Sequence, residues 1–290
     1  MLSAKPILFA LLGAAGVAFI ALWVHRARST RGRRLPSVLQ LAIGALTNFF
    51  DTLGIGSFAT TTSLYKLGGL VADENIPGTL NVGHMIPTFA EAFIFIQIVS
   101  VDMTTLTSMI GASVAGAWLG AGIVSSWSRR KVQLGMGVLL LVAAAIMVAR
   151  ATGLAPGGGQ ALGLSGARLA LAIAGNFVLG AFMTLGIGLF APCMILVALL
   201  GMRETTAFPI MMGSCAFLMP AASVRFVRSG RYDLPASIGL AIGGLPAVLA
   251  AAYWVKSLKL ETVKWLVVVV VVYTAVAMLR SAARRVDSHG

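Results

Sequence analysis

Charged side chains are scarce in this sequence. Only 11% of its 290 residues are charged, and just nine residues are acidic. Soluble domains carry about 25% charged residues, so this shortage excludes an ordinary soluble globular protein. The hydrophobic share of 58% predicts instead an integral membrane protein, with the lipid bilayer as a partner.

Residues that build metal centres and catalytic sites are also rare, with three histidines and two cysteines in the chain. The cysteines, Cys193 and Cys215, lie in apolar segments and have neither a zinc-binding spacing nor the density of a disulfide scaffold. No H-E-x-x-H motif, nucleophile elbow or phosphate-binding loop occurs. We therefore expect no metal, no cofactor and no enzymatic activity, and any transport must draw its energy from a gradient or a partner.

Basic residues outnumber acidic ones and give a net charge of +13. They stand in short clusters between apolar runs, which is typical of cytoplasmic loops beside membrane helices and not of a protein that binds nucleic acid. This distribution predicts that the N-terminus and the glycine- and proline-rich connection 153–166 lie outside the cell. The C-terminus is then inside, together with Arg33, Arg130 and Arg228. Three lysines depart from the rule: Lys256, Lys259 and Lys264.

The first apolar run covers residues 6–24. Only Lys5 precedes it, whereas an arginine-rich stretch follows it at 25–34. A signal peptide has the opposite order, with positive charge before the apolar run and a small-residue cleavage site after it. We therefore predict a retained transmembrane helix in a multi-pass protein of the inner or plasma membrane.

One short phrase occurs twice, as TLGIGSFA at 52–59 and as TLGIGLFA at 184–191. The offset is constant, since Gly54 and Gly186 are 132 residues apart (186 − 54 = 132). Each glycine in a helix interior costs about 1 kcal/mol relative to alanine, so a glycine pair favours a helix break with bare backbone. Breaks at matching places in two halves are typical of a transporter binding site.

The apolar segments repeat around these breaks. In the first half, short segments at 37–50 and 57–67 are followed by spans at 75–99, 104–124 and 132–149; in the second, segments at 167–185 and 190–200 are followed by spans at 205–226, 234–255 and 263–279. Spanning a bilayer takes about 20 residues, so the short pair of the first half predicts a re-entrant helix hairpin, with one tilted helix as the alternative interpretation. The second half is predicted to repeat this plan.

The fold class predicted is an all-α integral membrane protein with two inverted repeats. Each repeat has a re-entrant helix hairpin plus three transmembrane helices, because an odd number of spans reverses the second repeat. The organisation that follows has five parts: the N-terminal helix and basic loop 1–36, the first repeat 37–150, the linker 151–166, the second repeat 167–283 and the tail 284–290.

The two breaks supply most of the candidate substrate-binding residues. Helix starts carry unpaired N–H groups and a partial positive charge, so two facing starts make an anion site without a buried arginine or lysine. From the first break the candidates are Thr52, Gly54, Ile55, Gly56, Ser57 and Thr60. From the second break they are Thr184, Gly186, Ile187 and Gly188.

A polar stripe follows the first break, at spacings of 3, 4 and 3 residues: Asn81, His84, Thr88 and Glu91. This spacing places all four on one face of a single membrane helix. The counterparts in the second half are much less polar: Met211, Ser214, Leu218 and Ala221. We expect the stripe to line the cavity, with Asn81 and His84 contacting substrate; a hydrogen-bonded stripe that joins two helices is the alternative.

Three titratable residues are candidates for proton coupling: Asp51, His84 and Glu91. Acids at membrane depth are costly and indicate function, and histidine changes its charge near neutral pH. The alternative for Asp51, compatible with a functional one, is that it caps the half-helix that follows it.

The repeated pattern resembles the TauE/SafE sulfite exporter family, also called TSUP permeases, over residues 37–283. The likeness rests on two halves that each have a glycine-bearing break near the start and then a span with a glycine, Gly83 or Gly213. A proline commonly follows the break in the family. Here Pro192 follows the second break, whereas the first break has Thr60 at the corresponding position. The resemblance implies a permease for small anions, most often sulfite or organosulfonates. A carboxylate transporter, a membrane-embedded enzyme and an assembly factor are the alternatives, and a homodimer stays open.

Overall fold

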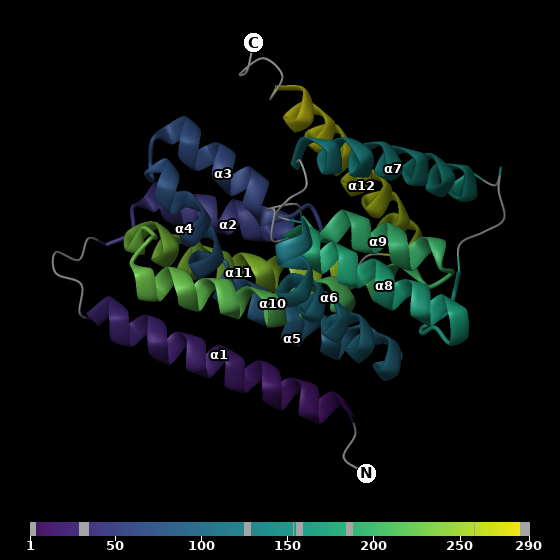
Figure 1. The fold of residues 1–290 in the computed structure, drawn as a ribbon, viewed down its shortest axis with the longest axis horizontal. Helices are drawn as coiled ribbons and strands as arrows, with labels where there is room; N and C mark the ends of the chain where they lie inside the picture. Colours follow the sequence, from purple (N-terminus) through teal and green to yellow (C-terminus); the bar gives the residue numbers. More distant parts are fainter. Residues whose placement is uncertain are drawn as a thin grey trace. The chain divides into compact units, whose positions relative to one another are not determined.

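The computed structural model describes residues 4–28, 35–124, 129–152, 154, 159–183, 188–257 and 259–284. In these ranges the regular structure is helical (Figure 1). The helices are α1 (Ala4–Arg28), α2 (Val38–Thr52), α3 (Ser57–Gly68), η1 (Asp73–Asn75), α4 (Ile76–Gly83), α5 (Met85–Ile98), α6 (Met103–Val124), α7 (Arg129–Ala151), α8 (Gly166–Met183), α9 (Phe190–Leu199), η2 (Glu204–Thr206), α10 (Ala207–Ser229), α11 (Leu234–Ser257) and α12 (Leu260–Arg284).

Six helical segments among the described residues are long and apolar enough to cross a membrane: Lys5–Arg28, Asp73–Ile98, Gly166–Met183, Glu204–Ser229, Leu234–Val255 and Trp265–Ala283. Large apolar side chains point outward from several of them, with Val269 62% exposed and Leu249 55% exposed. Such an apolar exterior is unfavourable in water and favourable in lipid. The prediction of an all-helical, multi-pass membrane protein is therefore confirmed.

The chain divides into two compact units. Unit 1 comprises Met1–Gln97 and Cys215–Ser257, and unit 2 comprises Ile98–Ser214 and Leu258–Gly290. Unit 1 therefore holds α1 to α5, all of α11 and most of α10. Unit 2 holds α6 to α9, all of α12 and the start of α10.

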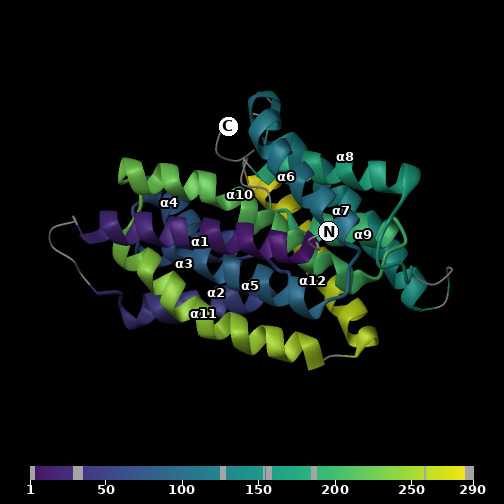
Figure 2. The ribbon, with the colours of Figure 1, turned by 90° about the horizontal axis from the view of Figure 1, so that it is seen from below.

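In unit 1, α2 packs closely against α11 (Figures 1 and 2). Glycines make this approach possible, because a Cβ added at Gly44 would lie 2.6 Å from the carbonyl oxygen of Gly239. A Cβ at Gly243 would collide with the carbonyl oxygen of Leu41. Small residues at a helix crossing let backbones approach in the way that membrane helices require.

Helix α3 runs back beside α2 instead of continuing it. Tyr65, near the end of α3, is fully buried in the same apolar cluster as Ile43 of α2 and Leu240 of α11. Gly69 then ends α3 in a left-handed conformation, with φ 58°. At about 1.5 Å per residue, neither α2 nor α3 is long enough to span about 30 Å of hydrocarbon.

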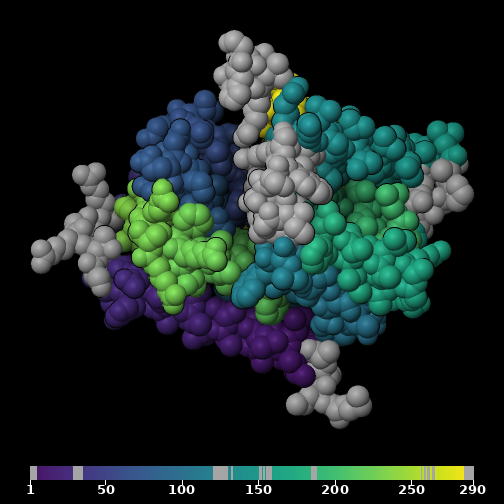
Figure 3. Space-filling model, viewed as in Figure 1, coloured from purple at the N-terminus to yellow at the C-terminus, as the bar shows by residue number. Residues whose placement is uncertain are grey.

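Helix α1 covers one flank of unit 1. The rings of Phe9 and Phe93 stack with centroids 5.4 Å apart, and Gly16 faces the ring of Phe89. The opposite side of α1 is uncovered in Figure 3, and its side chains include Leu11 and Val17, which are 56% and 69% exposed. This helix is therefore a peripheral addition that packs on α5 through one face.

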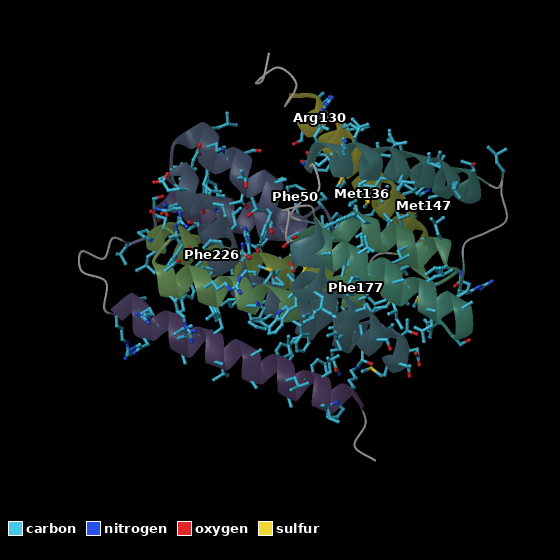
Figure 4. All side chains as sticks on the ribbon, viewed as in Figure 1. Phe50, Arg130, Met136, Met147, Phe177 and Phe226 are labelled. Carbon is cyan, nitrogen blue, oxygen red and sulfur yellow. The ribbon has the colours of Figure 1, made fainter. Side chains whose placement is uncertain are left out.

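In unit 2, α6 and α8 cross through glycines of both helices. A Cβ at Gly116 would collide with the Phe177 carbonyl, and one at Gly180 would collide with the Ser113 carbonyl. The same unit pairs α7 with α12, where Nε of Arg130 donates to the carbonyl oxygen of Ala282 at 3.2 Å (Figure 4).

Two of the predicted segments differ in detail from the structure. The predicted span over 75–99 is present as the candidate span Asp73–Ile98, with a one-residue interruption at His84 between α4 and α5. Pro87 explains the interruption, because it has no N–H to donate to the Gly83 carbonyl four residues earlier. In the second half, the first segment of the predicted hairpin, 167–185, forms the 18-residue helix α8, which is by itself long enough to be a candidate span.

Candidate functional site

The first break, residues 53–56, separates α2 from α3 through two glycines. Gly54 has φ 93° and Gly56 has φ 87°, values that favour glycine over any residue with a Cβ. The N–H of Gly54 donates to the carbonyl oxygen of Asp51 at 2.7 Å, which closes the end of α2. The chain then restarts as a helix at Ser57, inside unit 1.

The Asp51 carboxylate forms hydrogen bonds with Ser57, the first residue of α3. Its Oδ1 accepts from the Ser57 N–H at 2.9 Å, and its Oδ2 accepts from the Ser57 hydroxyl at 2.9 Å. The Asp51 side chain is 4% exposed. The carboxylate thus caps α3 from six residues earlier, while Gly56 at the cap position has no side chain to do so.

Glu91 lies fully buried against the other side of this turn. Its Oε1 is 2.7 Å from the hydroxyl of Thr52, which also lies 2.8 Å from the Asn48 carbonyl oxygen. Oε2 of Glu91 has no hydrogen-bond partner among the described residues. A buried carboxyl oxygen without a partner is costly, so this atom marks a place that a proton or a ligand can satisfy.

His84 occupies the interruption between α4 and α5, and both of its ring nitrogens are engaged. Nδ1 is 2.9 Å from Oδ1 of Asn48, and Nε2 is 3.1 Å from the hydroxyl of Thr61. The Asn48 amide nitrogen donates elsewhere, so Nδ1 of His84 carries the proton in this contact. A neutral ring then accepts the Thr61 hydroxyl proton at Nε2.

Asn48 is the centre of these contacts, and it was not among the residues predicted from the sequence. Its Nδ2 donates to the carbonyl oxygens of Gly44 at 2.7 Å and Leu240 at 3.4 Å. It therefore ties α2 to α11 while orienting His84. Its one signal in the sequence is a side-chain amide in the mainly apolar segment 37–50, a signal that Gln40 shares.

Together these side chains form the polar network of unit 1, which consists of Asn48, Asp51, Thr52, Ser57, Thr61, His84 and Glu91. Every member is buried, and the members come from α2, α3, α5 and the residue between α4 and α5. In the described part of the chain, no lysine or arginine hydrogen-bonds to the network. Among the described residues the network therefore holds two acids, one histidine and no lysine or arginine, a combination that at membrane depth points to a functional role.

The remaining predicted residues lie around the network or outside the described chain. The Thr60 hydroxyl donates to the Ser57 carbonyl at 2.8 Å, and Nδ2 of Asn81 donates to the Pro77 carbonyl at 2.9 Å, so both bond their own helices. Ile55 is half-buried in the first break. Three candidates, Thr184, Gly186 and Ile187, fall outside the described residues, whereas Gly188 is described and exposed.

A smaller version of the network occurs in unit 2. Nδ2 of Asn176 donates to the Ser214 hydroxyl at 3.1 Å and to the Met109 carbonyl oxygen at 2.7 Å. Ser214 is the sequence counterpart of His84, and Met109 lies six residues into α6, as Leu240 lies six residues into α11 (109 − 103 = 6; 240 − 234 = 6). In each unit a buried asparagine therefore joins two helices that are distant in the sequence, α2 and α11 in unit 1 and α8 and α6 in unit 2.

Comparisons with known proteins give no family assignment. No family model matches the sequence, and no curated protein or solved structure matches it either. The resemblance to the TauE/SafE exporters therefore stays a prediction, and the function has to be argued from the polar network and the first break.

Proposed function

We propose that the protein is a secondary transporter for small anions, with its substrate held at the first break in unit 1. The observation that carries this proposal is the first break itself. There, after two bare glycines, the chain restarts as a helix at the buried residue Ser57, beside a polar network and within a chain that has six candidate membrane spans among its described residues. Broken helices of this kind form the substrate sites of transporters.

The inverted-repeat arrangement belongs to the same proposal. The element order α2 to α7 recurs as α8 to α12, with a 3₁₀ turn after each short helix, η1 and η2. The hydrogen bonds from Asn48 to the Leu240 carbonyl and from Asn176 to the Met109 carbonyl support the correspondence between the two halves. On this view α2 and α3 are a hairpin that enters and leaves the membrane on one side.

The chemistry of the first break favours an anion with several oxygens. Ser57 offers a backbone N–H and a hydroxyl at the start of α3, where the helix dipole is positive. A sulfite or sulfonate group presents acceptor oxygens to both donors without needing a lysine or arginine. This substrate class agrees with the resemblance to the sulfite exporters of the inner membrane.

Uptake into proteoliposomes tests the proposal. The purified full chain is reconstituted, and radiolabelled sulfite, methanesulfonate, thiosulfate and acetate are supplied in turn under an imposed pH gradient. We expect saturable uptake of the sulfur oxyanions and little uptake of acetate, relative to liposomes without protein. A preference for acetate would instead identify a carboxylate transporter, and no uptake of any anion would overturn the proposal.

Cysteine labelling tests the topology that the proposal assumes. Cys193 and Cys215 are both buried, so a variant with alanine at both positions is the parent. Single cysteines at Arg130 and Arg228 should be labelled from the inside only, and one at Leu154, which is 85% exposed, from the outside only. Labelling of position 130 or 228 from outside would contradict the inverted arrangement.

A further inference from the structure

The donors that an anion needs at the first break are already occupied by Asp51. Both of its carboxyl oxygens are held by Ser57, one by the N–H and one by the hydroxyl. A substrate anion and the Asp51 carboxylate therefore compete for the same two hydrogens. Because both are negative, they also repel each other in a region from which water is largely excluded.

The neighbouring Glu91 is placed to hold a proton. The Thr52 hydroxyl has one hydrogen but lies within hydrogen-bond distance of two oxygens, Asn48 O and Glu91 Oε1. A carbonyl oxygen can only accept. When Thr52 donates to Asn48, the second contact is a hydrogen bond only if the Glu91 carboxyl donates it. The unpartnered Oε2 of Glu91 is also less costly on a neutral acid than on an ionised one.

Few other titratable groups face the two acids. The elements around α2 are α3, the α4–α5 helix and α11, and Asp51 and Glu91 act on each other electrostatically. His84 lies at the start of α5 with both nitrogens engaged, and Tyr65 of α3 points its hydroxyl at the Ala236 carbonyl, near Asp233. The other titratable groups on these elements are Lys66, Asp73 and Glu74, which are exposed, Tyr253, 79% exposed, and Lys256. On α1, which packs on α5, they are Lys5, His25, Arg26 and Arg28; on α10 they are Cys215, Arg225 and Arg228.

We propose that Asp51 is a tethered competitor of the substrate anion, and that a proton taken up by the Asp51–Glu91 pair releases Ser57 to bind that anion. This inference rests on the proposed function. In the empty site the pair holds one proton, on Glu91, and the Asp51 carboxylate keeps the start of α3 closed. A second proton neutralises Asp51, its hold on Ser57 weakens, and the anion takes the N–H and hydroxyl donors.

The charges balance in this cycle. One proton and one singly charged anion enter the site together, so the loaded site has the same net charge as the empty one. Loss of the proton on the opposite side restores the Asp51 carboxylate, which displaces the anion. His84 has no part in the proton transfer, because Asn48 and Thr61 occupy its ring; it positions α3 relative to α2.

The direct test is proton movement during uptake. Proteoliposomes containing the full chain and a trapped pH-sensitive dye receive methanesulfonate, which stays singly charged over the whole pH range. We expect uptake to rise as the external pH falls and to acidify the interior, with about one proton entering for each anion. Methanesulfonate uptake that is equal at all pH values and moves no protons overturns the inference and leaves the anion transporter standing.

Variants assign the effect to the two acids. Asp51→Asn keeps an oxygen that can accept from Ser57 but cannot be switched by a proton, and we expect its uptake to lose its pH dependence. Glu91→Gln imitates the protonated acid that the proposal assigns to Glu91, so it should keep the pH dependence and the entry of about one proton for each anion. Asp73→Asn is the matched control, since Asp73 is an acid at the surface that pairs with Lys66 at 3.4 Å, and it should keep the wild-type pH profile. A wild-type pH profile in Asp51→Asn, or a lost profile in Glu91→Gln, overturns the inference.

Infrared spectroscopy of the solubilised protein gives a readout that does not require flux. The carbonyl stretch of a protonated carboxylic acid should be present in the wild type and weaker in Glu91→Gln. Addition of methanesulfonate should strengthen it, because anion binding favours protonation of Asp51. If methanesulfonate is transported but leaves this band unchanged, only the inference fails. If no anion is transported, the proposed function fails with it.

Discussion

The two units contain matching frameworks with different chemistry. Each has a buried asparagine, Asn48 or Asn176, that reaches a backbone carbonyl of a distant helix. Each also has a glycine-lined helix crossing, α2 with α11 in unit 1 and α6 with α8 in unit 2. At four positions of the polar network, however, the second half substitutes residues without comparable chemistry. Asp51, Thr61, His84 and Glu91 correspond to Met183, Cys193, Ser214 and Ala221.

This difference separates what holds the fold from what performs the function. Features present in both units have to serve the architecture, because they occur whether or not acids and a histidine accompany them. Features confined to unit 1 are not needed for that architecture, and two buried acids lower stability, so their presence there points to a functional use. On our proposal one repeat carries the coupling chemistry and the other supplies an apolar counterpart.

The largest expected effect comes from the shared glycine crossings. Gly116→Ala places a Cβ against the Phe177 carbonyl, where backbone atoms must move. We expect a loss of stability of more than about 3 kcal/mol, beyond the usual range for overpacking, and little folded protein on size-exclusion chromatography. Gly111→Ala on the same helix meets nothing within 4 Å and is the matched control. Equal yields and melting temperatures for both variants would show that the crossing is looser than described.

The next effect distinguishes the first break from an ordinary helix end. Gly56 and Gly69 both have positive φ, and a Cβ at either would meet nothing within 4 Å. Alanine at either position therefore costs backbone strain of about 1–3 kcal/mol without a collision. Only Gly56→Ala places a methyl group at the start of α3, so it should reduce uptake more than tenfold, while Gly69→Ala should transport normally. Similar uptake by the two variants at matched protein levels would show that the first break does not bind the substrate.

The paired asparagines sharpen the comparison further. Asn48→Ala and Asn176→Ala each remove a buried amide that bonds two helices, and each should lower stability by about 1–3 kcal/mol. Only Asn48→Ala also frees His84, so it should impair uptake well beyond its effect on the melting temperature. Asn176→Ala should lose stability and retain uptake per folded molecule. The opposite result would move the site into unit 2.

The sequence was sufficient to predict the elements that depend on local composition. Apolar runs identified five of the six candidate spans, all except Gly166–Met183, and the glycine pair at 54 and 56 identified the first break, because both signals lie within one stretch of chain. The 3–4–3 spacing brought together His84 and Glu91, which are both buried in the network. Asn81, from the same pattern, instead bonds the Pro77 carbonyl of its own helix.

Contacts between distant segments could not be predicted in the same way. Asn48 bonds Leu240, which is 192 residues away, and nothing near Asn48 in the sequence indicates that partner. The interruption at His84 could not be predicted from Pro87 alone. Pro220 and Pro246 lie inside helices that continue through them, so a proline in an apolar segment does not always interrupt the helix. Neighbouring hydroxyls are equally ambiguous: Thr60 and Thr61 differ only by a rotation of about 100° around α3.

That rotation supplies the smallest expected effect. The Thr60 hydroxyl donates within α3, to the Ser57 carbonyl at 2.8 Å, whereas the Thr61 hydroxyl is the partner of His84 Nε2. Thr60→Val should change stability by less than about 0.5 kcal/mol and leave uptake unaltered, because a surface-like position tolerates the loss. Thr61→Val keeps the side-chain shape but leaves a buried ring nitrogen without a partner, at a cost of about 1–3 kcal/mol. It should also reduce uptake a few-fold, and Thr61→Ser should restore it. In the second half, Cys193 stands at the sequence position that corresponds to Thr61, and Ser214 stands at the one that corresponds to His84. Cys193→Val should therefore leave uptake unaltered, and a loss as large as that of Thr61→Val would mean that the two halves contribute equally to the site.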